Sequence, residues 1–216
     1  NRQVSAIIDC QSSSTCDTLT IQPFGDSITF GIGFADNTYC PVYGPGQNPC
    51  PKTPVAWGGG YRGWMTLIMK NNKNIFFKTQ GHQNGGSNLL QWQASTQSHD
   101  GYPGYRTDQM TGKSKMPSSA DITLLHAGTN DIYQLAAAKL DTNWSVAPIA
   151  DTLFTIVNNL LSTNPKTKVY VAKIIRFFPG EFVLSYVAAP MNVKVDQYNH
   201  LIEQKWNALP PALKSR

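Results

Sequence analysis

A serine and an asparagine each stand just after a short apolar run, where side chains able to act on an ester would be expected. Ser27 follows residues 18–24 (TLTIQPF) in a Gly-Asp-Ser triplet, and Asn130 follows residues 122–126 (ITLLH) in Gly-Thr-Asn-Asp. A serine hydroxyl can attack an acyl carbon, and an asparagine N–H can stabilise the resulting oxyanion. Either turn alone is more typical of a helix cap. Two such turns, each after a predicted strand, favour a catalytic site over two helix caps.

The elements that would position these residues alternate along the chain. Apolar and β-branched runs predict strands over 18–24, 75–78, 122–126 and 168–175, and apolar spacing predicts helices over 61–69, 146–159 and 193–209. Long polar loops are expected over 25–60 and 79–105. This order predicts an α/β fold, a flavodoxin-like three-layer αβα arrangement with a central parallel sheet. Ser27 and Asn130 would then share the carboxyl edge of that sheet.

Composition limits the class of protein. The chain has 216 residues, of which 41% are hydrophobic, and we expect a single domain over 1–216 with residues 1–17 as an N-terminal extension. No apolar run approaches the roughly 20 residues of a membrane span. The net charge is +5, but charged residues make up only 14% and are scattered. Neither a membrane nor a nucleic acid is therefore an expected partner.

The four cysteines lie in the first fifty residues, at Cys10, Cys16, Cys40 and Cys50. Their spacing favours local disulfides between the first two and between the last two, although four cysteines allow three pairings. No C-x-x-C pair supports a zinc site, so no metal is expected. Disulfides indicate an oxidising compartment, and the Asn143-Trp144-Ser145 sequon would be a glycosylation site there. A chain beginning at Asn1 fits a secreted, extracellular protein whose leader has been removed.

The motifs resemble those of a known enzyme superfamily. G-D-S-I-T-x-G at 25–31 and G-T-N-D at 128–131 are similar to blocks I and III of the SGNH, or GDSL, hydrolases. G-Y-R-x-x-M at 60–65 and D-G-Y-P-G-Y-R-T-D-Q-M at 100–110 look like carbohydrate esterase family 3, the acetylxylan esterases. The resemblance spans about residues 18–209. It implies the SGNH fold and removal of acetyl groups from a polysaccharide such as xylan, without a cofactor.

The resemblance also implies roles for individual residues. Ser27 would be the nucleophile, and its backbone N–H would be one oxyanion donor. Asn130 would give a side-chain donor. The remaining donor would be a glycine N–H after the second strand, for which spacing favours Gly86 over Gly85 and Gly81.

The base that the resemblance leads us to expect is missing. The family carries it in Asp-x-x-His after a fifth strand, and that motif does not occur here. Asp196 and His200 have a different spacing on the last predicted helix, where we expect a surface contact. We expect His126 to be a buried strand residue beneath the Asn130 turn. His82 and His99 fall in predicted loops from which they could reach the crevice.

Three explanations remain open. The chain could be the larger part of a nicked enzyme, since Lys214-Ser215-Arg216 is a sequence that proteases cut after, and a C-terminal fragment of the same precursor would then bring the histidine. It could be a truncated enzyme, lacking the last strand and helix of the fold. It could be a non-catalytic carbohydrate-binding relative. An exposed apolar sheet edge is costly, which favours the first two.

The expected substrate is an acetylated polysaccharide or oligosaccharide, and a lipid or aryl esterase is a further alternative. Aromatic residues in the predicted loops could stack on sugar rings, although such residues are more often core. They are Trp57, Trp92, Tyr102 and Tyr105.

Overall fold

The computed structural model describes residues 18–31, 61–71, 77–84, 97–139, 143–178 and 185–216. The four cysteines, the extension over 1–17, Trp57, Trp92 and the loop glycines Gly85 and Gly86 lie outside the described residues. The expectations for them therefore stay predictions.

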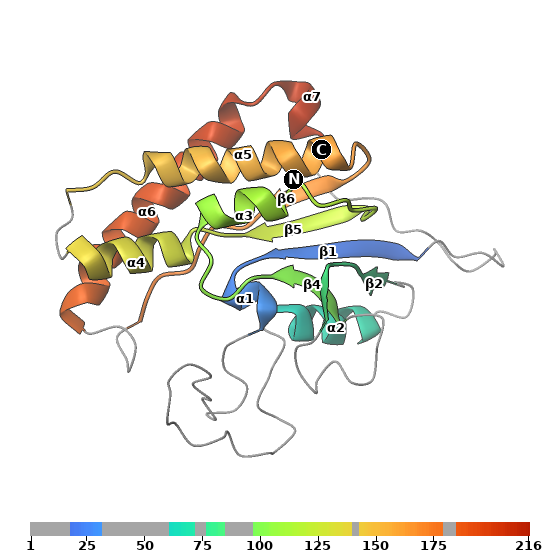
Figure 1. Ribbon diagram of the computed structural model, residues 1–216, viewed down its shortest axis with the longest axis horizontal. Helices are drawn as coiled ribbons and strands as arrows, with labels where there is room; N and C mark the ends of the chain where they lie inside the picture. The colour runs from blue at the N-terminus through green and yellow to red at the C-terminus, as the bar shows by residue number, and fades with distance from the viewer. Residues whose placement is uncertain (1–17, 32–60, 72–76, 85–96, 140–142, 179–184) are drawn as a thin grey trace, which may run out of the picture.

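Helices and strands alternate over most of the described chain (Figure 1). The strands are β1 (Leu19–Gly25), β2 (Phe77–Thr79), β3 (Gln83–Asn84), β4 (Ser98–Gly101), β5 (Ile122–His126) and β6 (Lys168–Val171). The helices are α1 (Ser27–Phe30), α2 (Tyr61–Asn71), α3 (Thr107–Lys113), α4 (Thr129–Lys139), α5 (Ala147–Thr163), α6 (Ser185–Ala208) and α7 (Pro211–Lys214).

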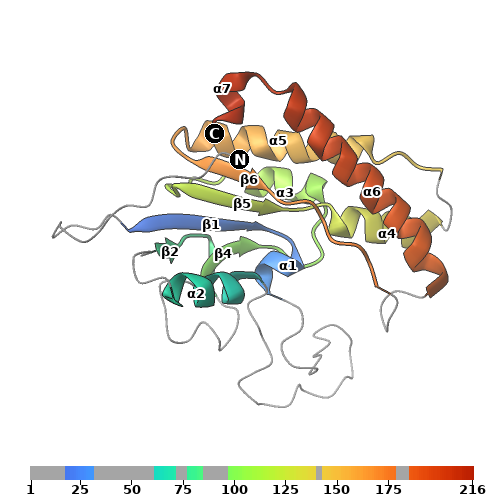
Figure 2. The same ribbon diagram turned by 180° about the vertical axis from the view of Figure 1, so that it is seen from behind.

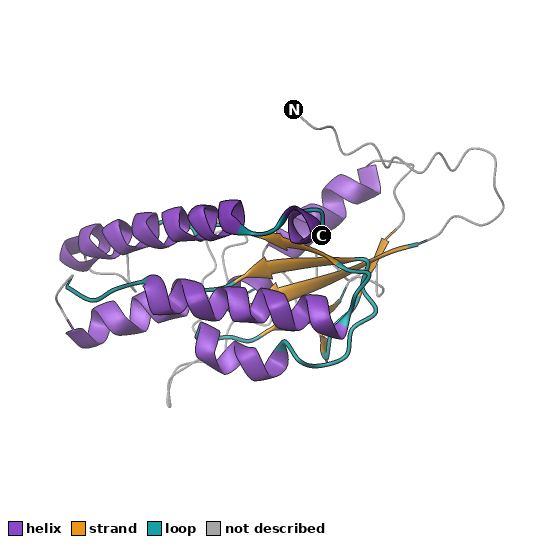
Figure 3. Cartoon of the chain, turned by 90° about the horizontal axis from the view of Figure 1, so that it is seen from above, coloured by secondary structure: helices purple, strands orange, loops and turns teal. Residues whose placement is uncertain are grey.

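The strands form one mostly parallel sheet in the order β3-β4-β1-β5-β6. β2 pairs in parallel with the first half of β1, and β4 pairs in parallel with its end, where Phe24 faces Asp100. Only the short β3–β4 pair is antiparallel among the described strands. Figure 2 shows α2 and α6 toward the viewer, whereas α3 and α5 lie nearer the viewer in Figure 1. From above, the strands lie between helices, so the expected α/β sandwich is confirmed (Figure 3).

The core lies mainly between the sheet and α5. This helix buries the apolar face that the sequence predicts, at Ile149, Leu153, Ile156, Val157, Leu160 and Leu161. Each such side chain contributes roughly 1.5–3 kcal/mol when it leaves water. Facing it, Phe24 and Leu125 from the central strands are at most 1% exposed. The two strands that precede Ser27 and Asn130 are thereby fixed by burial.

Several elements differ from the expectation. The predicted loop over 79–105 contains β3 and β4, and α3 and α4 were not predicted. The last predicted strand pairs only over Lys168–Val171, and α6 begins at Ser185 rather than near Val193. The strands β3 and β4 have polar sequences without apolar alternation, and side-chain hydrogen bonds from Gln22 to Asp100 and from Ser98 to Asn84 hold them. None of the helices in the described ranges is long and apolar enough to cross a membrane.

A row of buried polar side chains runs across the middle of the sheet. The Gln22 amide donates to Asp100 Oδ2 at 2.7 Å, and the Thr123 hydroxyl donates to Gln22 Oε1 at 3.1 Å. Thr123 also contacts the Thr167 hydroxyl at 3.2 Å. Buried polar groups are costly unless each has a partner, so these bonds specify the pairing of β4, β1 and β5.

Candidate active site

Ser27 is the first residue of α1, directly after the end of β1. Asp26 caps this helix, since its Oδ1 accepts the Ile28 N–H at 3.0 Å. Ser27 is half-buried, and within the described part of the chain its hydroxyl has no hydrogen-bond partner. The serine is therefore placed at the carboxyl end of a central strand with its hydroxyl unengaged.

Arg62 holds the other end of α1. Its guanidinium is fully buried and donates to the backbone carbonyls of Thr29 at 2.8 Å, Phe30 at 2.5 Å and Gln97 at 3.3 Å. Burial lowers the pKa of Arg62 to about 10. A cation at the carboxyl end of a short helix satisfies carbonyls that have no partner within the helix. Sequence reasoning noted the G-Y-R motif but not this role.

Asn130 lies in the first turn of α4, directly after β5. One N–H of its side-chain amide donates to the carbonyl of Tyr105 at 3.0 Å. An amide nitrogen carries two hydrogens, so this contact orients the group and leaves the second for another acceptor. Gly128 makes the turn with φ at +115°, a conformation that L-residues rarely adopt.

Asp131 ties the Asn130 turn to α3. Its buried carboxylate accepts the Thr107 backbone N–H at 2.9 Å and the Thr107 hydroxyl at 2.7 Å. Burial raises the pKa of the Asp131 carboxyl, and the hydrogen bonds from Thr107 oppose that rise. Tyr105 lies just before α3, and Thr107 is the first residue of that helix. Asn130 and Asp131 therefore both bond to the same segment of the chain.

Ser27 and Asn130 lie at one edge of the sheet. β1 and β5 are neighbours in register, with Gly25 opposite His126, and α1 and α4 begin just beyond that pair. Figure 1 shows both helices leaving the same end of the strands. The third predicted donor, Gly86, lies outside the described residues, and Gly81, the weaker alternative, stands just before His82 near β3.

Two histidines expected in loops are held by the sheet instead. His99 belongs to β4 and is fully buried, with Nδ1 accepting the Gly101 N–H at 3.0 Å. Burial is the largest cause that lowers its pKa to about 4, and the nearby Arg62 adds to it. The His82 ring contacts buried Asp100 at 3.0 Å. The expectation that His99 could reach the crevice is therefore wrong, because its ring packs inside, edge-on to Phe30.

The other two histidines also have neighbours other than Ser27. His126 ends β5 and is buried as expected, with Nδ1 3.5 Å from Asp26 Oδ1. His200 contacts Gln204 Nε2 at 2.9 Å on the exposed side of α6. Asp196 pairs with Arg176, so the expected surface contact between Asp196 and His200 is not formed. No described histidine is hydrogen-bonded to the serine.

Of the aromatic residues expected to stack on sugar rings, Tyr102 and Tyr105 are described; Tyr102 is buried in the core, and Tyr105 is partly buried against it. Tyr102 is 6% exposed and stacks on Tyr105 with ring centroids 5.3 Å apart. The Tyr102 hydroxyl donates to Asp100 at 2.9 Å. Burial and the Asp100 charge raise the pKa of this tyrosine well above its usual value. The stacked rings of Tyr102 and Tyr105 therefore support the segment whose Tyr105 carbonyl accepts the Asn130 N–H.

The fold is an α/β arrangement with a mostly parallel central sheet and flanking helices, and it is consistent with the SGNH hydrolase fold that the motifs led us to expect. A family 3 carbohydrate esterase from Clostridium thermocellum matches 89% of this chain and 74% of its own, with a TM-score of 0.56 and 20% identity. A carbohydrate esterase family 3 protein from Talaromyces cellulolyticus matches 87% of this chain and 73% of its own, with a TM-score of 0.51 and 17% identity.

An acetyl xylan esterase from Geobacillus stearothermophilus matches 86% of this chain and 71% of its own, with a TM-score of 0.50 and 16% identity. No protein-family model matches the chain, and no curated protein matches it. The likeness to these esterases is thus one of fold.

Proposed function

We propose that this chain supplies the nucleophile and part of the oxyanion hole of a secreted serine esterase that removes acetyl groups from a polysaccharide such as xylan. The observation that carries the proposal is the placement of Ser27 and Asn130 after neighbouring strands. The Ser27 hydroxyl has no hydrogen-bond partner among the described residues, and the Asn130 amide is oriented by the Tyr105 carbonyl. The solved structures of similar fold include esterases named for carbohydrate substrates, which supports the acetylated-sugar choice.

In the proposed reaction, Ser27 Oγ attacks the acetyl carbonyl carbon and its proton passes to a base. The carbonyl oxygen becomes an oxyanion, which accepts hydrogen bonds from the Ser27 N–H, the free N–H of Asn130 and the Gly86 N–H. Collapse of this intermediate releases the sugar alcohol and leaves an acetyl-serine, which water hydrolyses to acetate. Preorganised donors of this kind are typically worth about 3–4 kcal/mol each in the transition state.

We propose that none of the four described histidines is the proton acceptor for Ser27. His82, His99 and His200 are hydrogen-bonded to Asp100, Gly101 and Gln204 respectively. His126 is buried, with its Nδ1 3.5 Å from Asp26 Oδ1, and none of the four is hydrogen-bonded to Ser27 within the described residues. A C-terminal fragment of the same precursor, carrying a histidine, would supply the base that the described histidines do not provide. The same observation also favours a second candidate, a carbohydrate-binding relative without turnover.

Hydrolysis of 4-nitrophenyl acetate by the protein together with the C-terminal fragment of its precursor, and by Ser27→Ala in the same preparation, separates the two candidates. The esterase proposal expects turnover that the substitution abolishes, and acetate release from acetylated xylan in the same preparations. Turnover that survives in Ser27→Ala would remove Ser27 as the nucleophile. Binding of xylo-oligosaccharides with no turnover in either protein would establish the binding relative instead. Longer acyl chains as better substrates would point to a lipid esterase.

A further inference from the structure

The turn that leads into Asn130 lies directly against a tyrosine of α6. A Cβ atom on Gly128 would stand 2.5 Å from Cε1 of Tyr198 and 2.6 Å from its hydroxyl oxygen. The φ of Gly128 is +115°, so a side chain there would be strained by its conformation and would also meet the ring. The Tyr198 ring, which is fully buried, therefore occupies the space beside the backbone of this turn.

The hydroxyl of the same tyrosine is bonded to the turn. It donates to the carbonyl oxygen of Ala127 at 2.9 Å, although the two residues are 71 positions apart in the chain. That carbonyl belongs to the planar peptide that joins Ala127 to Gly128, so the bond sets the orientation of the peptide with which the turn begins. Both residues are buried, and a buried carbonyl that loses its donor is costly.

The tyrosine hydroxyl remains a hydrogen-bond donor at neutral and alkaline pH. Burial raises the pKa of Tyr198 well above its usual value, and the charges of Asp131 and Asp26 raise it further. These two carboxylates belong to the turns that carry Asn130 and Ser27. The hydroxyl therefore lies near both turns of the candidate site and does not titrate there.

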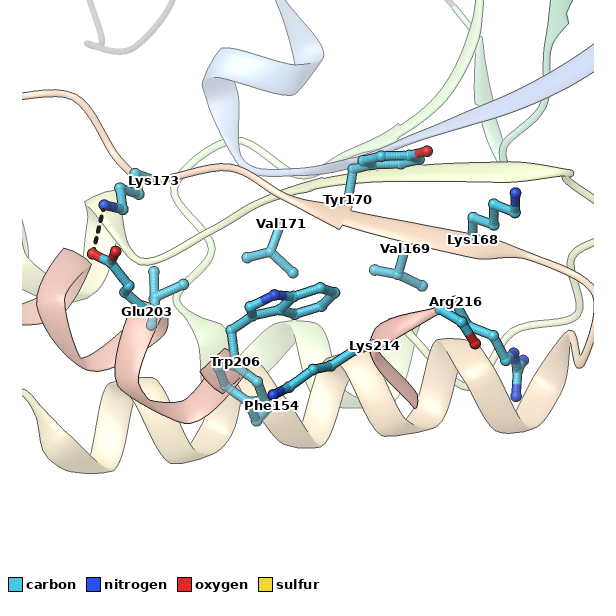
Figure 4. A pocket seen from close by; sticks show the side chains of 12 residues that line it. Phe154, Lys168, Val169, Tyr170, Val171, Lys173, Glu203, Trp206, Lys214 and Arg216 are labelled. Carbon is cyan, nitrogen blue, oxygen red and sulfur yellow. Dashed lines mark hydrogen bonds and ion pairs between the residues drawn. The ribbon is translucent and has the colours of Figure 1, made fainter. Parts of the chain in front are cut away.

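The helix that carries Tyr198 is itself anchored to the rest of the fold. Asn199, the next residue, exchanges two hydrogen bonds of 2.9 Å with the backbone of Ile174. Figure 4 shows the Trp206 ring, further along α6, lying between β6 and α5. Tyr198 thus connects the turn to a helix that is held by the sheet side of the molecule.

We propose that Tyr198 is a positioning residue for the oxyanion donor Asn130, because it fixes the Ala127–Gly128 peptide from α6. The Tyr105 carbonyl orients the Asn130 amide itself, so the turn is held at its start and at its donor. A misplacement of about 1 Å near a reacting group can cost on the order of 10²-fold in rate. The catalytic consequence of this inference rests on the proposed function, whereas the positioning of the turn does not.

Tyr198→Phe keeps the ring and removes only the hydroxyl. In the preparation that contains the C-terminal fragment, it should lower kcat for 4-nitrophenyl acetate at least about tenfold with little change in KM, because the donor is misaligned while the ester still enters the site. Asn199→Ala is the matched control, since it loses two hydrogen bonds on the same helix and none to the turn, and it should keep kcat. An unchanged kcat in Tyr198→Phe, or equal losses in both variants in step with stability, would overturn the proposal.

A second measurement needs no turnover. The side-chain amide of Asn130 gives a pair of proton–nitrogen correlation signals in NMR spectra, which are identified by their absence in Asn130→Asp. Tyr198→Phe should shift or broaden this pair, whereas Asn199→Ala should leave it in place. An unmoved pair in Tyr198→Phe would also overturn the proposal. A moved pair in a protein that hydrolyses no ester, even with the fragment present, would uphold the positioning role and count against the esterase function instead.

Discussion

Gly25 and His126 lie so close across β1 and β5 that a Cβ atom on Gly25 would stand 2.1 Å from the carbonyl oxygen of His126. The same atom would meet the Thr29 hydroxyl at 2.5 Å. The first contact is with backbone, which cannot swing aside as a long side chain can. The glycine before Asp26 thus lets the turn that carries Ser27 sit directly against the end of β5.

Gly25→Ala should lower the free energy of unfolding by about 1–3 kcal/mol, because the added methyl forces β1 and β5 apart. Urea unfolding followed by circular dichroism measures the change. Gly112→Ala is the matched control: its Cβ meets nothing within 4 Å, and it lies in helix α3. That control should be stabilising by about 0.5–1 kcal/mol. Equal stability of the two variants would contradict the close approach at Gly25.

Arg62→Gln should destabilise the protein by at least about 3 kcal/mol, because it leaves buried carbonyls at the end of α1 without donors. Arg62→Lys retains the charge but not the planar guanidinium fork. Its free energy of unfolding should therefore lie between that of the original protein and that of Arg62→Gln. Arg176→Gln is the control, since that arginine is exposed and pairs with Asp196 at the surface. It should leave the unfolding midpoint nearly unchanged. A similar midpoint for Arg62→Gln would rule out this role of Arg62.

His99 should make the protein less stable in acid. Its folded-state pKa is about 4, whereas an unfolded histidine has its pKa near about 6.5. Between those values the unfolded chain takes up a proton that the folded chain does not, so the free energy of unfolding falls as the pH falls. The loss is complete below about pH 4 and amounts to about 3 kcal/mol.

Unfolding midpoints from pH 7 to pH 4 for the original protein and for His99→Gln test this prediction. The variant should lose less stability over that window, because it has no proton to take up there. His200→Gln, at an exposed position on α6, should follow the original protein. Parallel curves for all three proteins would show that His99 is not held neutral.

The sequence predicts the elements that depend on local apolar patterns. The strand over residues 122–126 is found at the predicted positions, and α5 buries the predicted face. β4 could not be predicted because Ser98–Gly101 has no apolar alternation. It is held instead by bonds to Asp100 from Gln22 and Tyr102, and one of these partners is distant in the chain. The turns at Ser27 and Asn130 carry a local signal, whereas the role of Arg62 arises only when α2 packs beside α1.

The sequon should carry a glycan if the protein passes through a eukaryotic secretory pathway. Asn143 is exposed, while the intervening Trp144 is buried beneath Lys194, whose Nζ lies 5.1 Å from the ring centroid. Expression in a secreting host should give a heavier species that Asn143→Gln and peptide N-glycosidase treatment both remove. A mass equal to that of the unmodified chain would exclude glycosylation there.

Asn130 should act mainly on the reaction, because its one contact with the fold is the bond to the Tyr105 carbonyl among the described residues. Asn130→Ala removes an N–H aimed at the proposed oxyanion and should lower kcat for 4-nitrophenyl acetate about 10²–10³-fold with little change in KM. Asn130→Asp keeps the shape but has no N–H, so it should be no more active. Gln134→Ala, which loses a bond to the Gly104 carbonyl one turn further along α4, is the control and should keep kcat. If Asn130→Ala and Gln134→Ala lost activity equally and in step with stability, Asn130 would be a structural residue of this loop, and the oxyanion would need a donor elsewhere.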